Sequence, residues 1–111
     1  MEKGLLMQAL GRHLVVEPFH SCVVLAARLL DLAGTPAQRQ QWLPALVAGE
    51  QKLALLHHEK GDALPWGTRS CTAHACETGW VLNGAKAAAV GAVGAARWMV
   101  TATNSEGQTQ V

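Results

Sequence analysis

The densest cluster of titratable side chains in the sequence is His57-His58-Glu59. Imidazole and carboxylate groups this close together could bind a metal ion or move a proton. The apolar run from Lys52 to His57 predicts a short strand, and adjacent strand residues point to opposite faces. His57 and His58 would then not converge on one ion. The pattern therefore favours a polar strand end that enters a loop over a metal site.

A second set of possible ligands is Cys71, His74 and Cys76. If this segment is a strand, Cys71 lies on one face, whereas His74 and Cys76 lie on the other. The three side chains could not form a closed tetrahedral site, and no second Cys/His pair lies nearby in the sequence. Packed, half-buried cysteines are the favoured interpretation, and we assign no metal ligands.

Other catalytic patterns are missing from the sequence. It contains no Gly-x-Ser-x-Gly, no phosphate-binding loop and no dinucleotide glycine fingerprint. The stretch from Gly91 to Gly94 lacks the preceding strand and following helix that a phosphate cradle needs. There is no tyrosine to act as an acid or base. Residue patterns alone therefore assign no catalytic residue.

Composition limits the class of protein. The 111 residues form at most one small domain or part of a larger one, and half of them are hydrophobic. A net charge of +1 gives no field that would attract nucleic acid. An odd number of cysteines fits a reducing compartment, and no run of about 20 apolar residues predicts a membrane helix. We expect a soluble, cytoplasmic protein that binds neither nucleic acid nor a membrane.

The first half of the chain has helical periodicity. Leu5, Leu6, Ala9 and Leu10 share one face of a first helix, which we expect to end at Gly11.

A second helix is predicted from Cys22 to Leu32, after Glu17-Pro18 and before Gly34. It is apolar nearly all round, so we expect it to be buried among other elements.

The four residues Thr35-Pro36-Ala37-Gln38 predict the start of a third helix. Threonine at the N-cap, proline at the first helical position and glutamine three residues after the cap form a capping box. We expect Pro44 to bend or restart this helix and Gly49 to end it.

After Gly49 the periodicity changes to that of strands and turns. Lys52–His57 and Arg69–Ala75 are the first two predicted strands, with a loop from Glu59 to Gly67 between them. Glu77-Thr78-Gly79 predicts a hairpin turn into a third strand at Trp80-Val81-Leu82, and Arg97–Thr103 alternates with period two. Helices followed by antiparallel strands indicate an α+β fold or the joint between two domains.

The alanine-rich run between residues 85 and 96 is the least typical part of this pattern. Alanine favours helix, but Gly91 and Gly94 each disfavour helix by about 1 kcal/mol relative to alanine. The flanking Trp-Val-Leu and Arg-Trp-Met-Val segments are typical of strands. We therefore place this run in a β context, as a strand lined by small side chains.

The order of these segments resembles the acyl-CoA dehydrogenase family. GRHLVVEPF, at residues 11–19, is similar to the family's Gly-Arg and Glu-Pro segment before a buried helix. GTPAQRQQWLPALVAGEQKLAL, at residues 34–55, resembles the passage from the helical N-terminal domain into the first strand of the middle domain. GWVLNGAKAAAVGAVGAARWMVTAT, at residues 79–103, resembles the "Val-Leu-Asn-Gly-x-Lys" strand pair and the strand after it.

The resemblance implies an FAD enzyme that oxidises the α,β bond of an acyl-CoA thioester, with the flavin accepting the β hydride. Residues 1–50 would be the C-terminal part of the helical N-terminal domain. Residues 51–111 would be the first strands of a truncated β middle domain. The family's catalytic glutamate lies on a later helical bundle, so we expect a fragment that is not active alone, with no catalytic residue in this chain. Alone, such a fragment would leave helix faces and a sheet edge uncovered, which predicts poor solubility or self-association.

The cofactor-binding residues that the resemblance implies are His57, His58 and Glu59 in one segment and Ala88, Ala89 and Val90 in the other. Both segments depart from the family pattern. His58-Glu59-Lys60 stands in place of Thr-Glu-Pro, and Ala88-Ala89-Val90 replaces Trp-Ile-Thr, so a stacking indole and a hydroxyl are lost. The loop from Gly61 to Trp66 offers no serine for the diphosphate, and Leu64 lies near that place.

Two explanations of these departures stay open. Either the site binds flavin differently, or it is the vestigial half of a paired assembly. Under the second explanation, the chain resembles the small subunit of pimeloyl-CoA dehydrogenase and related two-subunit enzymes. It implies a second acyl-CoA dehydrogenase subunit as partner, with a homo-oligomer as the alternative. A rival hypothesis is a non-catalytic α+β subunit or dimerisation module that has lost flavin binding.

Overall fold

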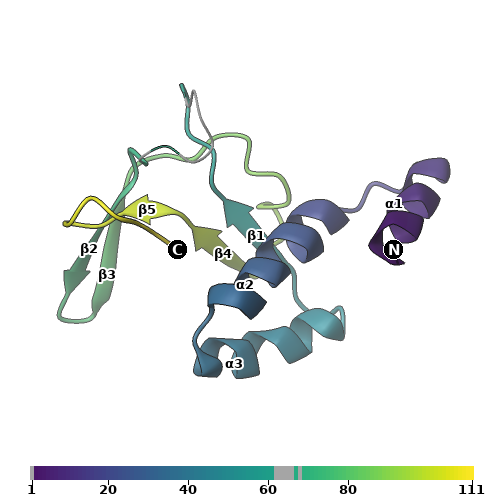
Figure 1. Ribbon diagram of the computed structural model, residues 1–111, viewed down its shortest axis with the longest axis horizontal. Coiled ribbons are helices and arrows are strands. Elements are labelled where there is room, and N and C mark those ends of the chain that lie inside the picture. Colours follow the sequence, from purple (N-terminus) through teal and green to yellow (C-terminus); the bar gives the residue numbers. More distant parts are fainter. Residues whose placement is uncertain (1, 62–66, 68) are drawn as a thin grey trace.

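The computed structural model describes residues 2–61, 67 and 69–111. In these residues the helical segments come first and the strands follow (Figure 1), so the predicted α+β class and element order are confirmed. The helical segments are α1 (Glu2–Arg12), η1 (His20–Ala27), α2 (Arg28–Ala33) and α3 (Pro36–Val47). The strands are β1 (Leu53–Leu56), β2 (Thr72–Cys76), β3 (Gly79–Asn83), β4 (Arg97–Val100), β5 (Ala102–Thr103) and β6 (Thr109–Gln110).

Helix α1 lies at one end of the molecule, away from the strands (Figure 1), and none of its residues is buried. The predicted helix is confirmed, but it does not end at Gly11. It continues to Arg12, and Leu14 then adopts a left-handed conformation with φ of 51°. The amide of Val15 donates to the carbonyl of Leu10 at 3.0 Å, which closes this end of the helix.

The second predicted helix is continuous but has two parts, a π-helical segment, η1, and the α-helix α2. Gly34 ends it, as predicted. The expectation that it is buried all round is wrong for this chain, because Leu25 and Leu32 are exposed. Only one face is buried, and on it Ala26 and Leu30 form a small core with Leu53 of β1. Helix η1–α2 is therefore the element that supports β1.

The capping box at the start of α3 is confirmed. Thr35 Oγ1 accepts a hydrogen bond from the amide of Gln38 at 3.2 Å, and Gln38 Oε1 accepts one from the amide of Thr35 at 2.8 Å. The helix does not restart at Pro44 but continues through it to Val47. Pro44 is exposed, so water can satisfy the carbonyl that proline leaves without a donor. Gly49, with φ of 76°, follows the helix end as predicted.

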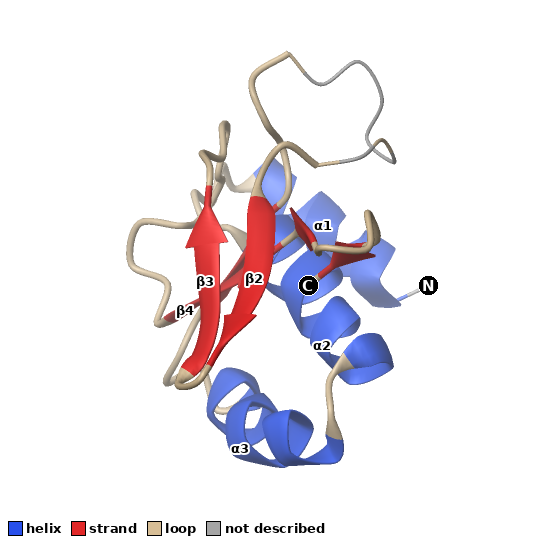
Figure 2. Ribbon diagram, turned by 90° about the vertical axis from the view of Figure 1, so that its left-hand side faces the viewer, coloured by secondary structure: helices blue, strands red, loops and turns tan. Residues whose placement is uncertain are grey.

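The strands form two small sheets with mixed pairing. In the first, β1 and β4 are parallel, with Leu53 opposite Arg97 and Leu56 opposite Val100. The second sheet has the order β3-β2-β5-β6. Its β2–β3 hairpin is antiparallel, as predicted, and stands out in Figure 2. β5–β6 is also antiparallel, but β2–β5 is parallel, so antiparallel pairing holds for only part of the β region.

The alanine-rich run is not a strand. Residues 84–96 form irregular turns between β3 and β4, so its expected place in a strand is wrong. Ala88 has φ of 49°, and Gly91 and Gly94 each have φ of 82°, which are incompatible with extended backbone. Gly91 also approaches η1 closely, because an added Cβ would lie 3.1 Å from Ser21 Oγ. Small residues therefore serve here to turn the backbone and let it approach a helix.

Candidate functional site

A buried ion pair lies where the segments after β1 and β3 meet. Glu59 Oε1 lies 2.6 Å from Lys86 Nζ, and the two side chains are only 5% and 6% exposed. Glu59 follows β1, and Lys86 follows β3 after the turn at Gly84. A buried charge is costly unless it is paired and hydrogen-bonded, so this arrangement requires a full set of partners.

The Glu59 carboxylate also binds the segment that leads into β2. Its Oε2 accepts a hydrogen bond from the amide of Ser70 at 2.5 Å, and its Oε1 accepts one from the amide of Cys71 at 2.9 Å. One carboxylate thus joins three parts of the chain: the end of β1, the approach to β2 and the segment after β3. These contacts explain why the charged side chain of Glu59 can be buried.

Lys86 makes two further contacts beside the ion pair. Its Nζ lies 3.3 Å from Thr101 Oγ1 and 3.4 Å from the carbonyl oxygen of His57, and it can donate to both. Thr101 Oγ1 also lies 3.1 Å from His57 Nδ1. The buried guanidinium of Arg69 donates to the same His57 carbonyl from NH1 at 3.4 Å. Polar side chains therefore surround the backbone at the end of β1.

The pKa of Glu59 reflects these contacts. Burial alone would raise the pKa, but the hydrogen bonds from Lys86, Cys71 and Ser70 outweigh it and lower the pKa from 4.5 to about 2. The folded state therefore holds the carboxylate more strongly than the unfolded state does. Its contribution to stability is fully present above pH 4.5 and is lost as the pH falls through about 2.

We accordingly expect the free energy of unfolding to fall between pH 4.5 and about 2, with Glu59 responsible for part of that fall. Urea unfolding at several pH values in this range measures it. The Glu59→Gln variant should be less stable at neutral pH and should show a shallower pH dependence. An equally steep dependence in that variant would contradict the role given to Glu59.

The two segments with predicted cofactor-binding residues lie next to each other. The amide of Ala87 donates to the carbonyl of His58 at 2.8 Å, beside the Lys86–Glu59 contact. His57 is half-buried, and His58 is exposed with its ring centroid 5.8 Å from that of His57. In the second segment Ala88 and Val90 are exposed and Ala89 is half-buried. The part of the diphosphate prediction that falls on residues 62–66, including Leu64, lies outside the described residues.

Glu59 differs from the other five predicted site residues because its carboxylate points into the protein. Sequence reasoning missed Arg69 and Thr101, for which there was no signal. It named Lys86 only as part of the Asn-Gly-x-Lys pattern. The pairing of that lysine with the retained glutamate was the one signal that could have located the buried ion pair.

The three residues of the possible zinc motif are separated by burial. Cys71 is buried against Gly84, whereas His74 and Cys76 are exposed on β2. Within the described part of the chain, no three His, Cys, Asp or Glu side chains are arranged to hold a metal ion. A hydrogen bond with the hydroxyl of Thr78 lowers the pKa of the Cys76 thiol, so this thiol is the more acidic for its position in the hairpin turn.

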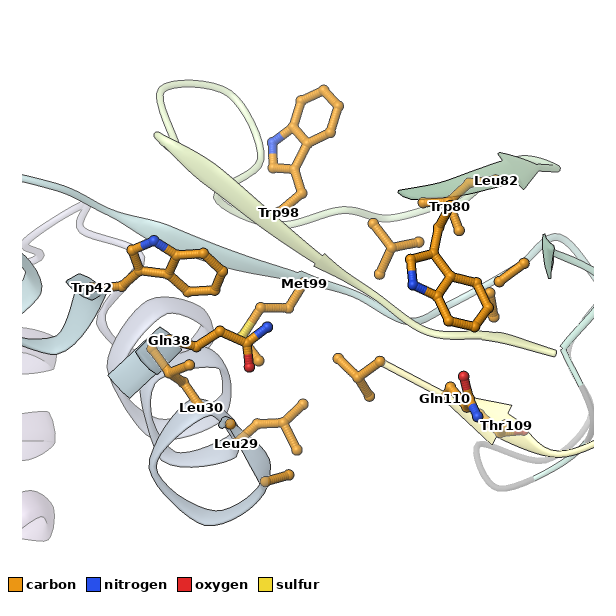
Figure 3. Close-up of a pocket in the computed structure, with 16 residues that line it drawn as sticks. Leu29, Leu30, Gln38, Trp42, Trp80, Leu82, Trp98, Met99, Thr109 and Gln110 are labelled. Carbon is orange, nitrogen blue, oxygen red and sulfur yellow. The ribbon is translucent and has the colours of Figure 1, made fainter. Parts of the chain in front are cut away.

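An apolar groove of about 700 Å³ lies away from the ion pair, between the helices and the strands. Figure 3 shows Leu29 and Leu30 on its helical side and Trp80 with Gln110 across from them. Trp42 also lines the groove, and the guanidinium of Arg97 lies 5.1 Å from the centre of its ring. None of the helices among residues 2–61, 67 and 69–111 has the length and apolar content needed to span a lipid bilayer.

Comparisons with known proteins give one informative match. The chain is similar to a solved structure described as a variant of the Tcur3481-Tcur3483 steroid ACAD, an acyl-CoA dehydrogenase, with 34% identity and a TM-score of 0.77. The match covers 87% of this chain but only 26% of that one. No family model matches the chain, and no curated protein matches it. The match supports the acyl-CoA dehydrogenase family, while the pimeloyl-CoA small-subunit type stays a prediction.

Proposed function

We propose that this chain is part of an FAD-dependent acyl-CoA dehydrogenase-like subunit. Residues 1–50 would belong to its helical domain and residues 51–111 to the start of its β domain. The similarity to a solved acyl-CoA dehydrogenase over 87% of the chain supports this assignment. The observation that carries it is the contact between the two segments with predicted cofactor-binding residues, where the amide of Ala87 meets the carbonyl of His58.

The segment Ala88–Val90, of which Ala88 and Val90 are exposed, has features that suit a flat cofactor. Its side chains are small and apolar, so they leave room for a planar ring to lie against the backbone. In the described part of the chain, the amides of Ala88 and Ala89 have no hydrogen-bond partner. These two donors could replace the hydroxyl group that the family pattern has at this place. Of the predicted residues, His57, His58, Ala88, Ala89 and Val90 would line the cofactor, while Glu59 would support them from within.

When bound, FAD would accept a hydride from the acyl chain of an acyl-CoA thioester. The chain itself would orient the flavin ring and keep water from one side of it. We assign no catalytic base here, so we expect no dehydrogenase activity from this chain alone. A second acyl-CoA dehydrogenase subunit or another copy of the subunit would complete the site. The matched structure is described as a steroid ACAD, so a steroid acyl-CoA is the first substrate to test.

Titration of the isotope-labelled chain with FAD tests this proposal through its backbone amide resonances. We expect shifts at His57, His58 and Ala87–Val90 because these residues form the proposed face. Val90→Asp should weaken binding on the order of tenfold, since it places a desolvated charge beside the ring. Val93→Asp is the matched control, because Val93 is 99% exposed in the same turn region and Val90 65%. Equal losses in both variants, or shifts confined to other residues, would contradict the proposal.

The rival function, a non-catalytic dimerisation module, is supported by apolar side chains on the strands. Trp80, Val81 and Leu82 of β3 are exposed, as is Trp98 of β4. Such a surface favours association with another chain. Under this alternative, FAD would leave the amide resonances unchanged, and the amide signals of β3 would broaden as the protein concentration rises.

A further inference from the structure

The segment Ala88–Val90 has few contacts that hold it in place. The amide of Val90 donates to the carbonyl of Ala88, and the amide of Ala92 donates to that of Ala89, so both bonds stay within the turn region. The two residues before this segment connect it to the rest of the fold. Ala87 donates a hydrogen bond to His58, and Lys86 contacts Glu59, the His57 carbonyl and Thr101. Its position relative to His57 and His58 therefore depends on residues 86 and 87 at one end, and on the close approach of Gly91 to η1 at the other.

The Lys86–Glu59 pair is poorly explained as a device for stability. Removing two charges from water costs several kcal/mol for each ion. Well-packed apolar residues of similar volume often give a protein of equal or greater stability. A buried pair can instead select one arrangement of the backbone among several. Here the pair brings together segments far apart in the sequence. Glu59 Oε1 accepts from Lys86 and from the amide of Cys71, and Oε2 accepts from the amide of Ser70.

We propose that Glu59 and Lys86 are positioning residues, which hold Ala88–Val90 against His57 and His58 in the arrangement that receives the flavin. This inference rests on the proposed function, but its geometric part concerns the free protein. Lys86 bridges the carboxylate after β1, the His57 carbonyl and the Thr101 hydroxyl. An apolar side chain of similar length could fill the same space, but it could make none of these three contacts.

The test compares Lys86→Met with the double variant Glu59→Gln/Lys86→Met. The double variant removes both charges of the pair, so its stability should recover toward that of the wild type. If the pair only supplied stability, FAD binding would recover as well. If it positions the segment, the amide resonances of Ala88–Val90 should stay displaced in both variants without FAD. The dissociation constant for FAD should then remain raised by about tenfold, the lower end of the loss seen when residues that orient metal ligands are mutated.

Lys52→Met is the matched control, because its ion pair with Glu17 is half-exposed and lies outside this cluster. It should change neither the Ala88–Val90 resonances nor FAD binding. Wild-type resonances at Ala88–Val90 in the double variant would overturn the inference, as would wild-type FAD affinity. Should Lys86→Met not fold, the double variant alone decides. If wild-type protein shows no response to FAD, the proposed function fails, while the resonances of the free variants still test the positioning role.

Discussion

Lys86→Met is expected to lower the free energy of unfolding by about 3 to 5 kcal/mol, the cost of removing one partner from a buried ion pair. The variant leaves the Glu59 carboxylate buried without its ammonium partner, while the amides of Ser70 and Cys71 still donate to it. Because small domains are stable by only about 5 to 15 kcal/mol, a loss of this size is a large part of the total. Urea unfolding followed by tryptophan fluorescence at neutral pH measures it.

The corresponding change at an exposed pair gives the scale for comparison. Lys52 Nζ lies 3.0 Å from Glu17 Oε2, and both side chains are at least half-exposed. Lys52→Met should therefore cost less than about 1 kcal/mol. Similar losses in the two variants would show that Lys86 is not desolvated as described, and the positioning role derived from its burial would fail with it.

Gly84→Ala is the second substitution with a large expected effect, about 3 kcal/mol or more. Gly84 has φ of 142°, which an L side chain rarely adopts. An added Cβ would also lie 2.7 Å from Cys71 Cα and 3.0 Å from Cys71 Cβ, so the backbone of one segment would have to move. Backbone strain and overpacking each cost roughly 1 to 3 kcal/mol, and both act here.

Gly79→Ala separates these two causes. Gly79 has a similar φ of 139°, but nothing lies within 4 Å of its added Cβ. It should therefore show the backbone strain without the clash and cost only about 1 to 2 kcal/mol. Thermal unfolding of both variants measures the difference. If Gly84→Ala is no worse than Gly79→Ala, the segment before Lys86 does not pack against Cys71 as closely as the structure indicates.

Local signals account for the parts of the fold that the sequence predicted well. The capping box at Thr35 depends on residues within one turn, and the structure has both of its hydrogen bonds. The β2–β3 hairpin likewise depends on a short turn between two strand-forming runs. In such cases the residues that determine the structure are neighbours in the sequence, so their pattern is visible without the fold.

Contacts between distant residues account for what the sequence could not show. The parallel pairing of β1 with β4 joins Leu53 to Arg97, and no local pattern indicates the direction of such a pair. The alanine-rich run was misplaced in a strand because its flanks are strand-like, whereas its path follows from the close approach of Gly91 to η1. The exposure of Leu25 was missed because an apolar helix face does not reveal whether this chain covers it.

The candidate site also has a part that could be predicted from the sequence and a part that depends on contacts between distant residues. Resemblance to a family placed His57–Glu59 and Ala88–Val90 in the site, and the structure places these two segments side by side. The resemblance could not show that the Glu59 side chain points inward. That orientation depends on Ser70, Cys71 and Lys86, which meet at its carboxylate. His57, His58 and Ala88–Val90 would thus face a cofactor, and the Glu59–Lys86 ion pair would hold them in place.

The most direct test of that account is a measurement of nuclear Overhauser effects between the ring methyl protons of FAD and the methyl groups of this chain. We predict contacts from the flavin ring to Ala88, Ala89 and Val90. Contacts only to residues of the apolar groove, such as Leu29 or Leu30, would contradict the proposed site, and so would the absence of any contact at saturating FAD.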